Sequence, residues 1–310
     1  LYNDCVTLVC PHRQIVRCIL AGNPTYSRRR PGKKSILFLC IATLLVVCYE
    51  LFLAFGGPGG TGTVQQGTVV HFIDVGQGDC ALILSGDDAV LIDAGLTATA
   101  DQVTEYLCAA GVSHLPAAVA PHPHEDHIGG MAAVLDAFQT DTLYLPAKTA
   151  ITPSYEAMLD AAERTGTAMQ VPAPGQRLSL DAHASLAFLA PDPDAVFESV
   201  NDYSIISLLS ADGLRVLFTG DAEAAAEQAL LDSGADIACD VLKVGHHGSD
   251  TSSTDAFLDA AAPKIAVISC GKYNEYGHPH PETLARLQAH GAAIHVTADT
   301  GTFLYPTPDT

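Results

Sequence analysis

The body of the chain, from residue 68 onward, alternates short apolar runs with alanine-rich stretches whose apolar residues recur at helical spacing. Short runs rich in Val, Ile, Leu and Phe are typical of strands, and the amphipathic stretches are typical of helices. The predicted strands are residues 68–75, 80–84, 89–93, 117–120, 185–190, 204–209, 215–220, 240–244, 265–270 and 302–305. The predicted helices are residues 101–110, 130–138, 155–165, 223–232, 255–261 and 281–290. This mixture favours two sheets, each covered by helices on its outer face.

An apolar segment at residues 36–55, interrupted only by Thr43 and Glu50, precedes the body. A helix of this length, at about 1.5 Å per residue, matches a bilayer core of about 30 Å, so we predict a transmembrane helix. The alternatives are a buried helix of a soluble core and a cleaved signal peptide, which the 35 preceding residues disfavour.

The flanks of this segment predict its orientation. Residues 1–35 are unassigned except for a basic flank, RRRPGKK, whose charges should stay cytoplasmic, whereas residues 56–67 form a glycine-rich linker. We therefore expect residues 68–306 to form one domain on the extracytoplasmic side of the cell membrane.

Charge is divided unevenly along the chain. Residues 1–60 hold seven Lys+Arg against two acids, whereas residues 61–310 hold eight against 33, a net charge of −25. So acidic a body is a poor general nucleic-acid binder, and any phosphate chemistry must be local, with metal ions supplying positive charge. None of the nine cysteines has C-x-x-C spacing. We expect buried thiols in the body, with one disulfide still open if the body is exported.

The segment HPHEDH, residues 122–127, follows a predicted strand and precedes a glycine-containing turn. Neutral imidazole and carboxylate are ligands of first-row divalent metals, and chance clustering is the less favoured explanation. Alternate residues of an extended loop project to the same side, so His122 and His124 can bind one ion. Asp126 and His127, past the bend, can face a second ion. The segment therefore predicts a site for two metals.

Other strand ends supply the remaining candidates. Two ions about 3.5–4 Å apart need a bridging oxygen, and Asp221 in LFTGDAE supplies one, although alone it would be interpreted as a helix N-cap. In KVGHHGS the sequence does not rank the adjacent His246 and His247. We expect His246 to complete the second metal's ligands and His247 to orient it or meet substrate. His278 and His280 could bind an oxyanion, donate a proton to a leaving group, or simply be exposed.

Taken together, HPHEDHIGG, LFTGD and VGHHGS in this order resemble the metallo-β-lactamase fold superfamily of metallohydrolases. FIDVGQGDC, LIDAG and GHPHPETL are more narrowly similar to the extracellular hydrolase domain of the ComEC family of DNA-uptake proteins. The resemblance covers about residues 69–305. It implies an α+β fold, an αββα four-layer sandwich, preceded here by the transmembrane helix. It also implies a dinuclear zinc or manganese site at the open edge between the sheets.

The resemblance further implies roles for individual residues. The implied metal ligands are His122, His124, Asp126, His127, Asp221 and His246. The expected catalytic residues are Asp126, His247, His278 and His280. Asp93 would orient a ligand histidine. Asp79 would lie in a loop beside the site, unless its glycines only form a β-turn.

The sequence departs from the broader superfamily at one metal position. Many members carry a further metal-binding histidine between His127 and Asp221, and the only candidate here is His183, which we interpret as structural. Asn201 and Ser204 instead stand where ComEC-like proteins have an Asn and a Ser ahead of a strand. One metal would then be held less tightly.

The leading hypothesis is a membrane-anchored, metal-dependent phosphodiesterase that acts on DNA in competence-type uptake. Its expected partners are the membrane, DNA as substrate, and a channel domain upstream in the same or another chain. One alternative is a hydrolase of the same fold acting on a small ester such as phosphorylcholine, or on a lactam, which the acidic body favours. Another is a non-catalytic docking module of an uptake channel, which the intact metal ligands disfavour.

Overall fold

The computed structural model describes residues 67–181 and 183–306. The predicted transmembrane helix at residues 36–55 and its basic flank lie outside the described residues. Within the described ranges, no helix is both long and apolar enough to cross a bilayer. The membrane segment therefore stays a prediction.

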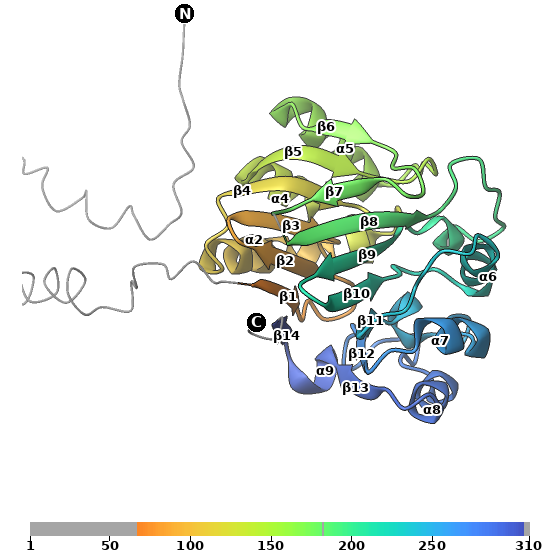
Figure 1. Cartoon of the computed structure of the whole chain (residues 1–310). Coiled ribbons are helices and arrows are strands. Elements are labelled where there is room, and N and C mark those ends of the chain that lie inside the picture. The colour runs from red at the N-terminus through yellow and green to blue at the C-terminus, as the bar shows by residue number, and fades with distance from the viewer. Residues whose placement is uncertain (1–66, 182, 307–310) are drawn as a thin grey trace, which may run out of the picture. The chain divides into compact units, whose positions relative to one another are not determined.

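Two seven-stranded sheets form the centre of the body (Figure 1). The first has the order β14-β1-β2-β3-β4-β5-β6 and the second β13-β12-β11-β10-β9-β8-β7. The strands of the first sheet are β1 (Thr68–Phe72), β2 (Ala81–Ser85), β3 (Asp88–Ile92), β4 (His114–Val119), β5 (Gln139–Tyr144), β6 (Ala168–Gln170) and β14 (Phe303–Pro306). Those of the second are β7 (Arg177–Ser179), β8 (Ala184–Ala190), β9 (Ile206–Ala211), β10 (Leu214–Phe218), β11 (Val241–Lys243), β12 (Ile265–Ile268) and β13 (Ala293–Val296).

Helices cover the outer face of each sheet (Figure 1). Those on the first sheet are α2 (Ala100–Ala109), α4 (Met131–Ala137) and α5 (Pro153–Thr165). Those on the second are α6 (Ala224–Asp232), α7 (Asp255–Ala261) and α8 (Pro281–Ala289). The short helical segments are η2 (Thr97–Thr99), α3 (Glu125–Ile128), η3 (Asn201–Tyr203), η4 (Gly245–Gly248) and α9 (Thr297–Thr300).

Strand alternation explains why the core has three layers of apolar contact. In β3, Val90 and Ile92 pack between the sheets, whereas Leu91 packs against the helices. In β10, Phe218 packs between the sheets and Leu217 against the second set of helices. Successive side chains of a strand point to opposite faces, so runs that are apolar at every position must be covered on both sides. The αββα sandwich expected from the sequence is therefore confirmed.

The predicted strands and helices of the body are confirmed, with ends shifted by a few residues, and β5, β6, β7 and β13 are additional. Cys80, Cys239 and Cys270 are buried thiols, as predicted. Several strands run parallel to a neighbour, namely β3 with β4, β10 with β11 and β11 with β12. Loops that follow parallel strands gather at one edge of a sheet, which is where ligands bind in open α/β sheets.

Candidate metal centre

The HPHEDH loop is pressed tightly against the chain that follows β3. A Cβ on Gly129 would lie 2.2 Å from the backbone nitrogen of Thr97, and one on Gly130 would lie 2.3 Å from the carbonyl oxygen of Ala94. Only glycine fits at such approaches. The two glycines therefore let the loop carry His122 and His127 into the interior, where neither imidazole is exposed.

Asp221 is the hub of the histidine cluster. Its Oδ2 lies 3.4 Å from Nε2 of His122 and 3.9 Å from Nε2 of His246. Its Oδ1 lies 3.1 Å from Nε2 of His127 and 3.6 Å from Nε2 of His247. Each carboxylate oxygen thus faces a different pair of imidazoles. This arrangement suits a carboxylate shared between two cations.

Buried polar atoms without hydrogen-bond partners test whether metal ions fit. Both ring nitrogens of His122, Nε2 of His127 and Oδ1 of Asp221 are in this state. Each such atom costs about 1–3 kcal/mol when nothing satisfies it. His124, at the exposed mouth, forms with His122 and Asp221 a group whose ligand atoms lie within 4.8 Å of one another. Imidazole and carboxylate atoms in this state fit divalent cations well.

Asp126 closes the other side of the cluster. Its Oδ2 accepts a hydrogen bond of 3.0 Å from Nε2 of His247. Burial alone would raise the pKa of Asp126, but the nearby imidazoles of His127 and His247 outweigh burial and hold that pKa well below its usual range. The carboxylate is therefore ionised near neutral pH and available to a cation.

A second layer of carboxylates lies behind the histidines. His127 donates from Nδ1 to Oδ1 of Asp93 at 2.7 Å, which leaves Nε2 facing Asp221. Asp79 lies 3.2 Å from Nδ1 of His247 and 3.9 Å from Nδ1 of His127. Asp79, His127, Asp221 and His247 also lie within metal-ligand range of one another. Because Nδ1 of His247 donates to the carbonyl oxygen of Ser269 at 2.9 Å and both Nε2 atoms face Asp221, we assign orientation of the rings to Ser269 and Asp93 and metal contact to Asp221.

Lys243 holds Asp79 in place. Its Nζ lies 2.6 Å from Oδ2 of Asp79 and donates to the carbonyl oxygen of Val244 at 2.8 Å. Both charged side chains are almost wholly buried. Lys243 is not among the residues predicted from the sequence, although a lysine inside the apolar strand DVLKV is a usable signal, because buried lysines are rare unless paired.

Replacing Lys243 by Met should destabilise the metal-free chain by about 3–5 kcal/mol, because it leaves Asp79 as an uncompensated buried charge. Urea unfolding after EDTA treatment measures this. Lys264→Met removes a lysine from the exposed ion pair with Asp240, and it should leave the unfolding midpoint unchanged. Adding Asp79→Asn to Lys243→Met should recover part of the loss. Equal midpoints for the two lysine variants would show that the buried pair contributes nothing.

His246 and His247 lie on a left-handed turn, with φ values of 46° and 53°. This conformation is costly for residues other than glycine, and here it turns both imidazoles toward Asp221. Nδ1 of His246 lies 3.1 Å from Oε1 of Glu223, and its Nε2 lies 3.4 Å from Nδ2 of Asn201. Glu223 was not singled out from the sequence, where it looked like the start of a helix.

Ser204 lies at the metal centre, whereas His183 lies away from it. Ser204 accepts a hydrogen bond of 3.0 Å from the backbone nitrogen of Asp221, so it fixes the hub. His183 is exposed and pairs with Asp212, as expected of a structural residue. The structure thus brings every predicted metal ligand to one place. Of the tandem histidines, His247 is the one that lies near Asp126 and near Oδ1 of Asp221, whereas His246 lies near Oδ2 of Asp221.

His278 and His280 differ in their surroundings. The ring centre of His278 lies 5.4 Å from that of His246, and its Nδ1 is buried without a hydrogen-bond partner. Burial, followed by the neighbouring imidazoles, lowers the pKa of His278 to about 4. Nδ1 of His280 accepts from the backbone nitrogen of Asp250, and its Nε2 donates to the carbonyl oxygen of Tyr276. His278 therefore faces the centre, whereas both nitrogens of His280 brace its loop.

A cavity of about 480 Å³ lies elsewhere, between α6 and strands β8 to β10. Its wall is mainly apolar, and it approaches the surroundings of the metal centre at Asp202, whose Oδ1 accepts from the backbone nitrogen of Glu223. The cavity lacks the converging imidazoles and carboxylates of the centre. We therefore locate the chemistry at the metal centre.

Comparisons with known proteins agree with this geometry. The family model of the metallo-beta-lactamase superfamily matches residues 73–272. The chain is 32% identical to ComE operon protein 3 of Bacillus subtilis, over 84% of the chain and 35% of that protein. It is 33% identical to competence protein ComA of Neisseria gonorrhoeae, over 71% of the chain and 30% of that protein. The chain thus spans about a third of the length of these curated relatives.

A solved structure shows the same fold. The metallo-beta-lactamase fold protein YhfI of Bacillus subtilis superposes with a TM-score of 0.54 at 16% sequence identity. The match covers 78% of this chain and 100% of YhfI. A match at this low sequence identity shows a shared fold and does not identify the substrate.

Proposed function

The chain belongs to the metallo-beta-lactamase superfamily, and from this premise we propose that it is a metal-dependent phosphodiesterase that cleaves DNA. The observation that carries the proposal is Asp221, whose two oxygens face two separate pairs of imidazoles. A shared carboxylate of this kind is typical of two-metal sites that hydrolyse phosphoesters. The similarity to competence proteins supports DNA as the substrate.

We assign His122, His124 and Asp221 to one metal position. Asp126, His127 and Asp221 serve the other, with His247 beside it and His246 beside the first. The ligands are nitrogen and oxygen atoms, a set that suits zinc and manganese. Divalent ions bound there supply a nucleophile from water near neutral pH and offset the charge of a phosphate.

The chain's own residues position the reaction. Asp93 accepts from Nδ1 of His127 and the carbonyl oxygen of Ser269 accepts from Nδ1 of His247, so that both Nε2 atoms would be turned toward the ions. His278 stays neutral at physiological pH, and we assign to its half-buried imidazole a contact with an oxygen of the scissile phosphate. An acidic body repels a polyanion, so the ions must supply most of the local attraction.

We further propose that the domain is anchored by the predicted helix at residues 36–55 on the extracytoplasmic side of the cell membrane. The basic segment at residues 28–34 supports this orientation. Because the chain spans about a third of its competence relatives, a channel domain in the same or another chain is the proposed partner.

The test is hydrolysis in the presence of manganese or zinc of four substrates, namely single-stranded DNA, duplex DNA, bis-p-nitrophenyl phosphate and a chromogenic lactam. We expect cleavage of DNA and of the small diester, and none of the lactam. If DNA stays whole while the small diester turns over, the nuclease proposal is wrong and the small-ester alternative, which the acidic body favours, takes its place. If metal-loaded protein turns over none of the four substrates, the proposed hydrolase is wrong, and the non-catalytic docking module is the alternative that takes its place.

A further inference from the structure

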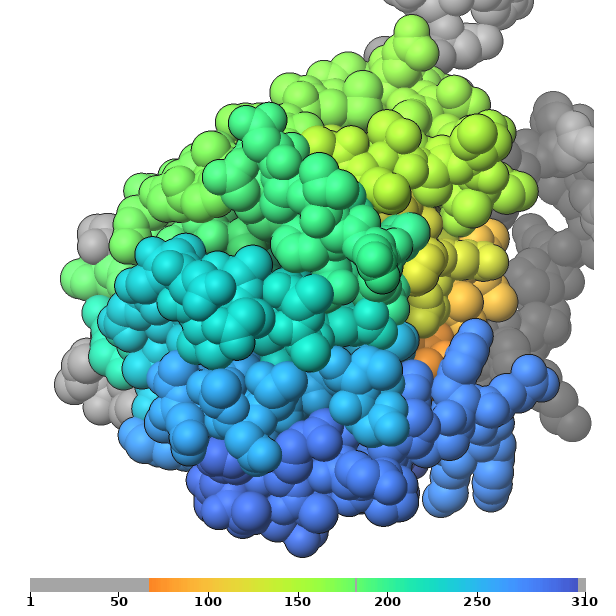
Figure 2. All heavy atoms as spheres, turned by 90° about the vertical axis from the view of Figure 1, so that its right-hand side faces the viewer, coloured from red at the N-terminus to blue at the C-terminus, as the bar shows by residue number. Residues whose placement is uncertain are grey.

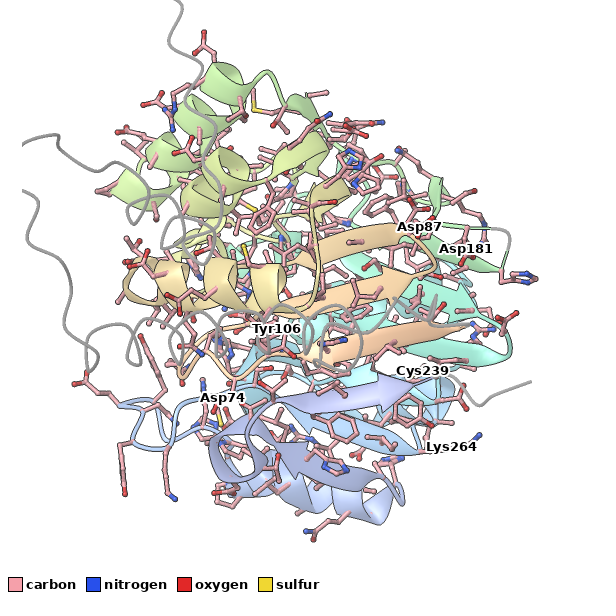
Figure 3. All side chains as sticks on the ribbon, turned by 90° about the vertical axis from the view of Figure 1, so that its left-hand side faces the viewer. Asp74, Asp87, Tyr106, Asp181, Cys239 and Lys264 are labelled. Carbon is pink, nitrogen blue, oxygen red and sulfur yellow. The ribbon has the colours of Figure 1, made fainter. Side chains whose placement is uncertain are left out.

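The loop of residues 271–280, which we call the tyrosine loop, projects beside the metal centre. Tyr273 is 92% exposed and Tyr276 is 66% exposed. In Figure 2 the blue segment that includes this loop extends beyond the body at the right, and Figure 3 shows it from the opposite side, near the labelled Asp74. Large aromatic rings held in solvent on one loop are unusual unless they bind something.

The tyrosine loop is braced rather than loose. Nδ2 of Asn274 donates to the carbonyl oxygens of Gly271 and His278 at 2.7 and 2.6 Å, and its Oδ1 accepts from the backbone nitrogen of His278 at 2.9 Å. Oε1 of Gln77 accepts from the backbone nitrogen of Gly271 at 3.0 Å. The two ends of the loop are thereby tied together and to the body. Because the loop is already ordered, binding of a ligand to its aromatic rings costs little conformational entropy of the loop.

Aromatic rings run in a column from the metal centre to solvent. The ring of His278 lies 6.1 Å from that of His247 with 26° between the planes, and 5.5 Å from that of Tyr276 with 21° between the planes. These are offset-stacked arrangements. A flat ring resting on the exposed face of Tyr276 would continue the column.

The loop carries one lysine and one glutamate, Lys272 and Glu275, so its formal charges cancel and Lys272 is its one group that can pair with a phosphate. Lys272 is exposed and, within residues 67–181 and 183–306, has no carboxylate at ion-pair distance, whereas Lys243 and Lys264 do. Elsewhere on the body, Nζ of Lys148 lies 4.8 Å from the ring centre of Tyr203. A duplex hides the faces of its bases, and a single strand offers them together with phosphates.

We propose that the tyrosine loop is a base-stacking platform that selects single-stranded nucleic acid for the metal centre. Tyr276 and Tyr273 receive successive bases, and Lys272 contacts a phosphate. This inference rests on the proposed phosphodiesterase function and names the form of its substrate. Stacking is tolerant of sequence, because every base has a ring face.

The experiment compares Tyr276→Ala and Tyr273→Ala with the parent protein, loaded with manganese. Each change should raise KM for a single-stranded dT oligonucleotide between about 5-fold and 100-fold, as loss of one base–aromatic stack predicts. In Tyr273→Ala, turnover of bis-p-nitrophenyl phosphate should fall far less than that of the oligonucleotide, because a small diester can fill the centre without resting on Tyr273. Tyr276→Trp should keep the parent KM. Leu304→Ala, at an exposed apolar residue of β14, is the matched control and should have no effect.

The outcomes separate this inference from the proposed function. Fluorescence anisotropy measures oligonucleotide binding apart from cleavage. If the parent binds the oligonucleotide, loses binding in both alanine variants, and cleaves no DNA, the platform stands and the nuclease proposal fails. If the alanine variants bind and cleave DNA like the parent, the platform is wrong and the nuclease proposal stands. Inhibition of diester turnover by choline that vanishes in Tyr276→Ala would identify a cage for a quaternary ammonium and overturn the platform.

Discussion

Asp221→Ala should strip metal from both positions and reduce turnover of bis-p-nitrophenyl phosphate at least about a thousandfold, which is about 4 kcal/mol of transition-state stabilisation. The physical reason is that one carboxylate faces both halves of the cluster, with Oδ1 toward His127 and Oδ2 toward His122. Removing it leaves the imidazoles and Asp126, with no carboxylate that both ions could share. Elemental analysis of metal per chain, together with the turnover assay, measures the effect.

One further variant separates the charge of Asp221 from its shape, and a variant at an exposed aspartate is the control. Asp221→Asn keeps the volume of the side chain and removes its charge, so we expect it to lose metal nearly as fully as Asp221→Ala. Asp136→Ala removes an exposed aspartate that pairs with Arg164, and both metal content and turnover should stay at the parent level. Circular dichroism establishes that each variant is folded. Unchanged metal content in folded Asp221→Ala would rule out the shared carboxylate, and with it the two-metal assignment.

The body's fold could be predicted from the sequence where burial shapes the pattern. Strand β3 is apolar at nearly every position because both of its faces are covered, and β10 shows the same pattern. Strand β5, QTDTLY, was missed because its first four residues are polar and only its end is apolar. Strand β13 was missed because it lies at a sheet edge, where half-buried positions leave little pattern.

The metal centre was predictable as far as its residues are contiguous. The HPHEDH segment shows its ligands in one short stretch, and Asp221 follows a strand at a glycine. The contributions of Lys243 and Glu223 depend on contacts between distant segments, 2.6 Å to Asp79 in one case and 3.1 Å to His246 in the other. No local pattern encodes such contacts.

The tandem histidines show the same limit. The sequence could not rank His246 and His247, because the left-handed turn that separates their directions is invisible in the residue types. His280 likewise looked catalytic until its two ring nitrogens were found bonded to Asp250 and Tyr276. Which side chain meets the ions and which one braces a loop is decided by the backbone, and the sequence only supplies the candidates.

Raising the pH from 6 to 8 should tighten metal binding at the second position by up to about tenfold per pH unit for each imidazole, His127 or His247, that must give up a proton there. Burial opposes a charge on His127, but Asp221 and Asp93 outweigh it and raise the pKa of His127 well above its ordinary value. In the same way Asp221 and Asp79 overcome burial and raise the pKa of His247 to about 10. His247 is therefore protonated in the metal-free protein across this range, and the raised pKa of His127 acts in the same direction, so each added pH unit weakens the competing protons.

The first position should respond differently to pH. Burial, with the neighbouring His127, lowers the pKa of His122 to about 4, so this ligand is already neutral at pH 6 and has no proton to release. The two positions should then fill in order as the pH rises, the first before the second. Isothermal titration in buffers of different ionisation enthalpy counts the protons released per ion bound. Binding of both ions with one pH-independent affinity would show that the carboxylates do not hold His127 and His247 protonated.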